Sequence, residues 1–260
     1  MLGVHVIGIG ILGPGLTDWA SAAPLLREPG RWRFLPCVVP PPVRLAPTER
    51  RRAGTGVKAS LVVADQALAG SSVDAATLAT VFTSSTGEPA NCHALCEALA
   101  TLDRMVSPTR FTNSVHNASA GYWHIAAASR AASTSLAAFD ASVAAGLLEA
   151  AVQCSSTQAP VLLVACDAPY PEPLHALRPV ADVFAFALLL APAGGRSLRL
   201  APRVETEATP CGHAGLEAVR CAIPAARALP LLQALAGDAA ASLVLPGLEG
   251  SALQVEVGAA

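Results

Sequence analysis

The chain alternates between continuous apolar runs and segments in which small apolar residues mix with polar ones. A run of aliphatic residues bounded by Gly, Pro or Ser is typical of a strand buried on both faces of a sheet. Strands are predicted at residues 4–11, 80–84, 133–136, 160–166 and 180–191. The Ala-rich segments between them have the length and residue content of helices. Helices are predicted at residues 18–26, 57–69, 91–102, 118–132 and 137–152.

Strands that alternate with helices indicate an α/β protein whose sheet is covered on both faces. Arg50, Arg51 and Arg52 follow a Pro-rich loop and are predicted to open a helix. After residue 202 the pattern weakens. There, one or two helices are predicted at 212–236, and strands at 241–245 and 253–257. We therefore divide the chain into a main unit, 1–200, and an extension, 201–260, that packs on this unit or on a partner.

Composition narrows the possible functions. The 260 residues are 53% hydrophobic and 14% charged, which suffices for one well-buried core. A net charge of −2 gives no basic footprint for nucleic acid. The mean hydropathy of +0.48 is high, yet no run reaches the roughly 18–20 apolar residues of a membrane span. We interpret the high hydropathy as a sign of a buried subunit interface.

The cysteines and the N-terminus indicate a cytoplasmic protein. There are seven cysteines, an odd number, scattered through apolar sequence. This distribution is typical of reduced thiols and not of a disulfide framework. The first residues lead directly into a predicted strand, without a basic segment or a cleavage site, so we expect no signal peptide.

A Gly-x-Gly-x-x-Gly sequence at Gly8, Gly10 and Gly13 follows the first predicted strand. In a dinucleotide-binding fold, the third glycine opens a helix whose N-terminus holds a pyrophosphate. Here a proline and a glycine follow at once, and the predicted helix starts only near Asp18. We therefore interpret these glycines as the turn by which a strand leaves the core.

Two further motifs have a structural interpretation. Cys92, His93 and Cys96 could supply zinc ligands from one helix, but no second pair lies at a suitable spacing. We expect buried structural thiols there, and no metal. Residues 84–87 (Ser-Ser-Thr-Gly) follow a strand but lack the Gly-x-Ser-x-Gly nucleophile elbow, so we expect a turn.

Several segments, taken in order, resemble the β-ketoacyl synthase family. They are residues 4–15, 106–121, 134–139, 144–152, 161–165 and 182–190. Thr134-Ser135-Leu136-Ala137-Ala138-Phe139 stands where that family carries Thr-Ala-Cys-(Ala/Thr)-Ser-Gly. Residues 113–123 and 140–150 more closely resemble the short synthase-like chain length factors of aryl polyene pigment clusters. The resemblance implies a thiolase-like layered α/β fold with a mixed central sheet, truncated to the N-terminal half of a ketosynthase.

The resemblance also implies that the chain has no acylation chemistry. The nucleophilic cysteine of the family falls on Leu136, whose side chain has no lone pair to attack a thioester. Phe139 stands in place of a glycine that keeps the turn tight. The active-site histidines of the family belong to the missing second half. Gly212-His213 resembles one such motif, but no His-Gly-Thr-Gly run precedes it, so we interpret His213 as a surface or helix-start residue.

What the resemblance implies is a non-catalytic subunit that pairs with an active β-ketoacyl synthase and shapes its acyl tunnel. Leu136 would close the vestigial acyl site, flanked by Ser135 and Phe139. The residues expected at the tunnel and interface are Thr112, Val115, His116, Asn117 and Gly121. The basic cluster of Arg50, Arg51 and Arg52 is a solvated helix start or a docking site for an acyl carrier protein. No cofactor is implied.

Two alternatives remain open. The chain could be an independent acyltransferase or hydrolase, with Ser135 or Cys166 as nucleophile and His116 or His213 as base. It could also be a scaffold that binds a carrier protein and never joins a synthase. His116 and His124 have no evident nucleophile or carboxylate partner in the sequence, which favours structural or interface roles.

Overall fold

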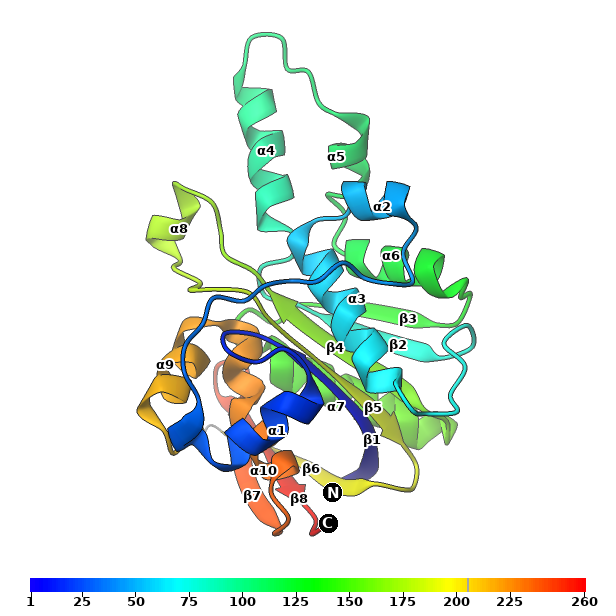
Figure 1. Ribbon diagram of the computed structural model, residues 1–260, viewed down its shortest axis with the longest axis vertical. Coiled ribbons are helices and arrows are strands. Elements are labelled where there is room, and N and C mark those ends of the chain that lie inside the picture. Colours follow the sequence, from blue (N-terminus) through cyan, green and yellow to red (C-terminus); the bar gives the residue numbers. More distant parts are fainter. Residues whose placement is uncertain (205) are drawn as a thin grey trace.

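A computed structural model describes residues 1–204 and 206–260, and it places an eight-stranded sheet between two layers of helices (Figure 1). The strands are β1 (Leu2–Leu12), β2 (Ala79–Thr83), β3 (Ser133–Leu136), β4 (Val161–Asp167), β5 (Phe184–Ala191), β6 (Arg196–Val204), β7 (Ala241–Pro246) and β8 (Ser251–Val257). The helices are α1 (Trp19–Arg27), α2 (Pro47–Arg52), α3 (Thr55–Leu68), α4 (Pro89–Ala100), α5 (Pro108–Thr112), α6 (Ala118–Ala127), α7 (Ser142–Thr157), α8 (Leu174–Leu177), α9 (Ala214–Ala222) and α10 (Leu229–Ala236), with 3-10 helices η1 (Pro29–Arg31) and η2 (Pro224–Ala228). No helix in the described ranges is long and apolar enough to cross a membrane.

The sheet is mixed, which confirms the predicted fold class. Its order is β3-β2-β4-β5-β1-β6-β8-β7. β2 is parallel to both β3 and β4, whereas the other neighbouring pairs are antiparallel. The carboxyl ends of β2, β3 and β4 therefore lie together, which is where parallel strands commonly carry functional sites. The C-terminal residues extend this same sheet through β6, β8 and β7; the domain boundary at residue 200 stays a prediction.

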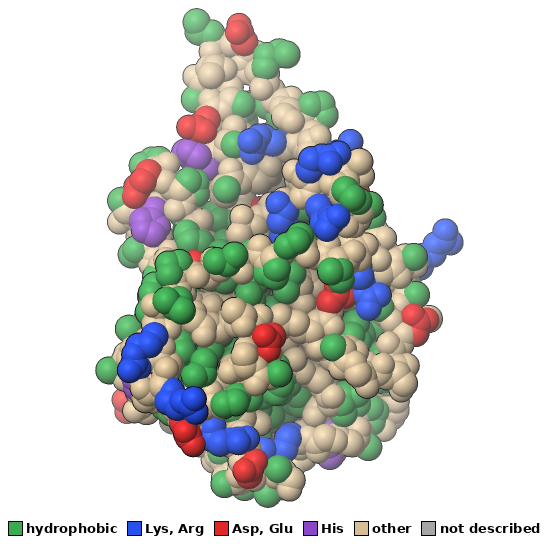
Figure 2. All heavy atoms as spheres, viewed as in Figure 1, with side chains coloured by type: hydrophobic (Ala, Val, Ile, Leu, Met, Phe, Trp, Pro, Cys, Tyr) green, Lys and Arg blue, Asp and Glu red, His purple; other side chains and the backbone are tan. Residues whose placement is uncertain are grey.

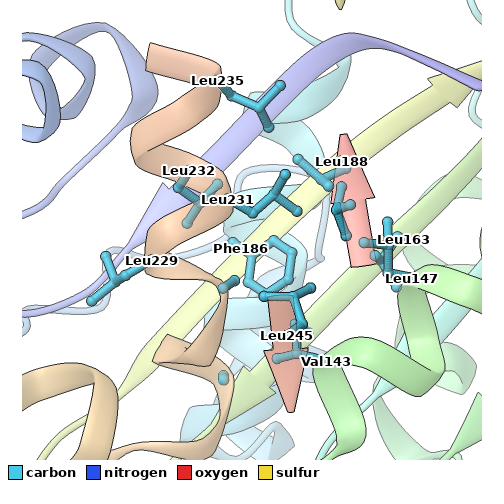
Figure 3. Close-up of a cluster of buried hydrophobic side chains, with 14 of the residues drawn as sticks. Val143, Leu147, Leu163, Phe186, Leu188, Leu229, Leu231, Leu232, Leu235 and Leu245 are labelled. Carbon is cyan, nitrogen blue, oxygen red and sulfur yellow. The ribbon is translucent and has the colours of Figure 1, made fainter. Parts of the chain in front are cut away.

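Alternate residues of the central strands face opposite helical layers. In β4, Leu163 packs on the layer that contains α1, α7, α9 and α10, and Leu162 packs on the layer of α3 and α6. Figure 3 shows the first of these layers, where Leu231 of α10 and Leu147 of α7 gather around Phe186 of β5. Both faces of the central strands are thus buried, as their uninterrupted apolar sequences require.

The glycines of β1 allow α3 to lie directly on the strand. A methyl group at Gly8 would overlap the carbonyl oxygen of Ala67, and one at Gly10 would overlap the carbonyl oxygen of Val63. β1 is antiparallel to both of its neighbours, so the strand-helix-strand unit that binds a dinucleotide is not formed here. The Gly-x-Gly-x-x-Gly sequence therefore serves close packing between helix and strand.

Some predicted boundaries are wrong. The helix predicted from residue 137 begins at Ser142, because the residues before it form a turn in which the N–H of Ala141 donates to the carbonyl of Ala138 (2.9 Å). The three arginines end α2 and do not open a helix, since α2 already starts at Pro47, a residue well suited to the first turn. The pattern also misses β6, whose apolar residues are interrupted by arginines.

α4 and α5 form an arm that projects from the layered body (Figure 1). Apart from Pro89, no residue of α4 is buried. Cys92 and Cys96 are exposed on it, so the prediction of buried thiols is wrong for this pair. His93 instead pairs with Glu97 of the same helix (Nε2–Oε1, 3.3 Å). Among residues 1–204 and 206–260, no three potential metal ligands come together.

Candidate functional site

The turn between β3 and α7 is the centre of the candidate site. Leu136 is the last residue of β3. The Oγ of Ser142 accepts a hydrogen bond from the N–H of Ala138 (3.0 Å) and donates one to the carbonyl of Phe139 (2.7 Å). Phe139 has a φ of 48°, in the left-handed region that costs a residue other than glycine about 1–2 kcal/mol. Ser142 thus fixes a strained turn directly after Leu136.

A small cavity lies beside Leu136, at the carboxyl ends of β2, β3 and β4. Its wall includes Ser135, Leu136, Val115, His116 and Cys166. Its volume is about 30 Å³, which is of the order of one or two water molecules. The structure therefore brings together four of the residues expected at the site, but the cavity is too small for an acyl chain. Phe139 and Thr112 lie outside its wall.

The two alternative nucleophiles are not activated. Cys166 is buried, and burial together with the negative charge of Asp167 raises the pKa of its thiol well above the ordinary value. The reactive thiolate is therefore scarce at neutral pH. His116 lies in the same cavity wall as Ser135, but no hydrogen bond joins the two within the described residues. His213 instead accepts from the N–H of Leu216 (3.4 Å) at the start of α9.

Asp167 organises the turn that follows β2. Its Oδ1 accepts from the backbone N–H groups of Ser85 (2.7 Å) and Thr86 (2.8 Å), and from the hydroxyls of Ser84 (3.0 Å) and Thr86 (3.1 Å). The residue is only 1% exposed, and burial raises the pKa of its carboxyl, although these hydrogen bonds limit the rise. The sequence predicted the turn but not that Asp167 accepts its hydrogen bonds. An acidic residue at the end of an otherwise apolar strand was the feature that could have indicated this role.

Asp140 holds two arginines next to the strained turn. Arg178 Nη2 lies 2.7 Å from its Oδ1, and Arg227 Nη2 lies 2.8 Å from its Oδ2. Arg178 also donates to the Oγ of Ser85 (2.7 Å), and its Cζ lies 3.8 Å from the centroid of the Phe139 ring. We call Phe139, Asp140, Arg178 and Arg227 the Asp140 cluster. It connects the turns after β2 and β3 to η2 and to the segment before β5, and sequence reasoning missed it.

Comparison with known proteins identifies the family. The sequence profile of the β-ketoacyl synthase N-terminal domain matches residues 36–242, which is most of the chain. The chain belongs to the β-ketoacyl synthase family. No curated protein matches this β-ketoacyl synthase family member in sequence.

Solved structures share the fold of this β-ketoacyl synthase family member. A structure of a ketosynthase in complex with its chain length factor from Xenorhabdus doucetiae has a chain that is 23% identical, with a TM-score of 0.76, covering 98% of this chain and 100% of that one. The ishigamide ketosynthase/chain length factor gives a TM-score of 0.74 at 14% identity, covering 100% and 99%. A ketosynthase from module 1 of the bacillaene synthase of Bacillus amyloliquefaciens gives 0.56 at 16% identity, but only 46% of that chain is covered.

The residues expected at a tunnel or interface lie at the end of α5, in α6 and in the segment between these two helices. Thr112 ends α5 and is exposed, as is Val115. An open groove of about 410 Å³ runs between α6 and β3. Its walls are formed by His116, Asn117, Ala120, Gly121, His124, Ser133 and Ser135. Four of the seven are thus predicted site residues of this synthase-like chain, and they face solvent in the single chain.

Basic side chains gather over α2 and the base of the arm (Figure 2). Arg51 and Arg52 of α2 line a hollow there together with Lys58 and Arg110. The Nδ2 of Asn113 donates to the carbonyl of Arg52 (2.9 Å), which ties α2 to the residues after α5. The predicted docking residues are therefore part of a larger basic surface.

Glu88 supplies the N-terminal cap that α3 lacks. The residue before α3 is Gly54, which has no side chain to accept a hydrogen bond. The Oε1 of Glu88 accepts from the N–H of Val57 (2.5 Å), and a methyl group at Gly54 would overlap this carboxylate. Burial raises the pKa of the Glu88 carboxyl, while the Val57 bond and the charge of Lys58 oppose that rise. The basic hollow and the small cavity both include this residue.

We expect Glu88→Ala to lower the free energy of unfolding by about 1–2 kcal/mol, because α3 loses its cap. Glu88→Gln keeps an oxygen that can accept from Val57 and removes the buried charge, so at pH 7 it should stay within about 1 kcal/mol of the parent. Urea unfolding at pH 7 measures both variants. An equal loss in the two would show that charge, and not capping, is what Glu88 contributes.

Proposed function

We propose that this chain is a non-catalytic, chain-length-factor-like subunit of a heterodimeric β-ketoacyl synthase. The active partner performs the condensation in the cytoplasm, on acyl chains of the aryl polyene or polyketide type. This chain limits the length of the partner's acyl tunnel. An acyl carrier protein docks at the basic surface that includes Arg50, Arg51 and Arg52.

The observation that carries the proposal is the end of β3. Leu136 has neither a nucleophilic atom nor an activated neighbour, because Cys166 is buried with a raised pKa and Ser135 has no bonded base. Covalent acyl transfer requires a nucleophile and a base within hydrogen-bond reach. Two of the similar structures are of a ketosynthase with a chain length factor, which supports a paired function for this chain.

The open edge of the sheet supports pairing through β3. The N–H of Thr80 donates to the carbonyl of Ala132 (3.1 Å), and that of Ser84 donates to the carbonyl of Leu136 (3.3 Å). Because the bonding direction alternates along a strand, the backbone groups of Ser133 and Ser135 point away from β2. Within the described residues, nothing pairs with them.

The opposite edge of the sheet is protected. At β7, the N–H of Thr209 donates to the carbonyl of Val244 (3.0 Å), and the N–H of Val244 donates to the Oγ1 of Thr209 (2.9 Å). Pro246, at the end of the same strand, has no N–H to offer. Such devices prevent a strand edge from pairing with another chain. The contrast between the two edges favours β3 as the surface for a partner strand.

The first test is co-expression with candidate catalytic ketosynthases, followed by size-exclusion chromatography with mass detection. We expect a one-to-one complex, and poor solubility when this chain is produced alone. If this chain is a stable monomer that binds none of the ketosynthases tested, the proposal is wrong. The carrier-binding scaffold, or an activity at Ser135, would then be the next hypothesis.

Ser135→Pro should weaken the complex by about tenfold to a hundredfold in Kd, because it removes an outward N–H and places a ring on the open edge. Proline is tolerated where the N–H of an edge strand faces solvent, so the fold should survive. Ser242→Pro is the matched control, since Ser242 is exposed on the β7 edge. Titration by light scattering or calorimetry measures both. Equal weakening by the two variants would count against β3 as the interface.

A further inference from the structure

The Asp140 cluster lies in the turn that follows Leu136 and contacts the turn that follows β2. Phe139 and Asp140 follow Leu136 in the turn, on the side toward α7 and η2. The small cavity lies on the other side of Leu136, toward α3 and α6. Arg178 joins the cluster to Ser85, whose neighbour Ser84 is in the cavity wall. The cluster therefore lies against the turns that follow β2 and β3.

We propose that the Asp140 cluster closes the vestigial acyl site of this subunit to the pantetheine arm of an acyl carrier protein. This inference rests on the proposed function, in which carrier proteins deliver acyl chains to the heterodimer. It adds the reason why those chains are loaded only onto the partner. The arm is a thin, flexible chain that ends in a thioester, so a lid made of a few side chains is enough to exclude it.

The conformation of Phe139 supports a lid. Its backbone is left-handed, and the residue is 63% exposed. A strained residue persists only where its surroundings over-determine it. Here Ser142 fixes the carbonyl of Phe139, and the guanidinium of Arg178 lies 3.8 Å above the ring. These two contacts thus hold the exposed ring in one place at the surface, next to the turn.

The ion pairs hold this lid in place. Asp140 uses both of its oxygens, one for each arginine, and the arginine side chains are only 25% and 22% exposed. Each arginine comes from a different segment, Arg178 from the stretch after α8 and Arg227 from η2. Ion pairs that are shielded from solvent are screened less by salt than exposed ones. Opening the lid would therefore separate several segments at once.

The test places a reporter thiol at the vestigial position. Leu136→Cys is made alone and in combination with Phe139→Gly or Arg178→Ala, in the full chain and in its complex. Each protein is treated with a chloroacetamide derivative of pantetheine, and alkylation is followed peptide by peptide by mass spectrometry. Glycine accepts the left-handed backbone of residue 139, so Phe139→Gly removes the ring without adding strain.

We expect the thiol at position 136 to react at least a hundredfold more slowly than exposed Cys92 while the cluster is intact. Either opening variant should raise its rate at least tenfold. Phe34→Gly and Arg199→Ala are the matched controls, because both residues are exposed and lie outside the cluster. Buried Cys166 reports loss of the fold. If Cys166 also becomes reactive in one opening variant, that variant has loosened as a whole. The test of the lid then depends on the labelling rate in the other opening variant.

Two results would overturn the inference. A thiol at position 136 that reacts as fast as Cys92 in the intact protein means that the site is open. A slow rate that neither opening variant changes means that other residues close it. Size-exclusion of the same samples reports the heterodimer independently. The proposed function can therefore fail while the labelling result stands, and the reverse also holds.

Discussion

Gly10→Ala is expected to lower the free energy of unfolding by about 3 kcal/mol or more, at the upper end of what overpacking costs. The added methyl group would overlap the carbonyl oxygen of Val63 and press on the side chain of Gln66. The obstacle is the backbone of α3, which cannot rotate away as a side chain would. α3 would have to move off the sheet, and it covers β1, β4 and β5 there. Urea unfolding followed by circular dichroism measures the loss.

Gly3→Ala provides the control for this prediction. Gly3 lies on the same strand, is exposed, and has no atom within 4 Å of the position of an added methyl group. The substitution restricts the unfolded chain by the same amount as Gly10→Ala does, so it should be neutral or stabilise by up to about 1 kcal/mol. If the two variants unfold alike, close approach of α3 to β1 is not what the glycine provides. Gly8→Ala, which faces Ala67, should behave like Gly10→Ala.

The central strands could be predicted because each is buried on both faces and therefore carries an uninterrupted apolar sequence. β4, for example, is buried at every position. β6 could not be predicted in this way, because only one of its faces is covered and Arg199 and Arg203 stand on the other. The start of α7 was missed for a different reason. Ala137 and Ala138 favour helix, but the hydroxyl of Ser142 stabilises a turn in their place.

From the sequence, site residues could be predicted only where they lie together in one continuous segment. Leu136 was found because the residues around it match a family motif in order. Asp140, Arg178 and Arg227 were not found, because the three are far apart in the sequence and each alone is an ordinary surface charge. The predicted helix over Asp140 also hid the turn on which the cluster depends. Long-range ion pairs leave no periodic pattern, so only the fold reveals them.

Asp167→Ala is the second substitution with a large expected effect, a loss of about 3 kcal/mol in the free energy of unfolding. It leaves the N–H groups of Ser85 and Thr86, and two hydroxyls, without their acceptor. The turn that carries Ser84 and Ser85 should then loosen. Because Arg178 is bonded to Ser85, the lid over Leu136 should loosen with it. Urea unfolding, and the labelling rate at position 136 in the Leu136→Cys background, measure the two effects.

Asp167→Asn separates the hydrogen bonds from the charge. Its amide oxygen can replace Oδ1 as acceptor, so at pH 7 the loss should stay within about 1 kcal/mol.

Burial raises the folded-state pKa of Asp167 above its unfolded value near 3.9. The parent therefore holds this proton more tightly when folded, and its stability falls as the pH rises from the unfolded to the folded pKa. Asp167→Asn should lack that part of the decline, while the part due to Glu88, whose pKa is also raised, remains. If the parent instead gains stability across this window relative to Asp167→Asn, the hydrogen bonds outweigh burial, and the ionised carboxylate is what stabilises the turn.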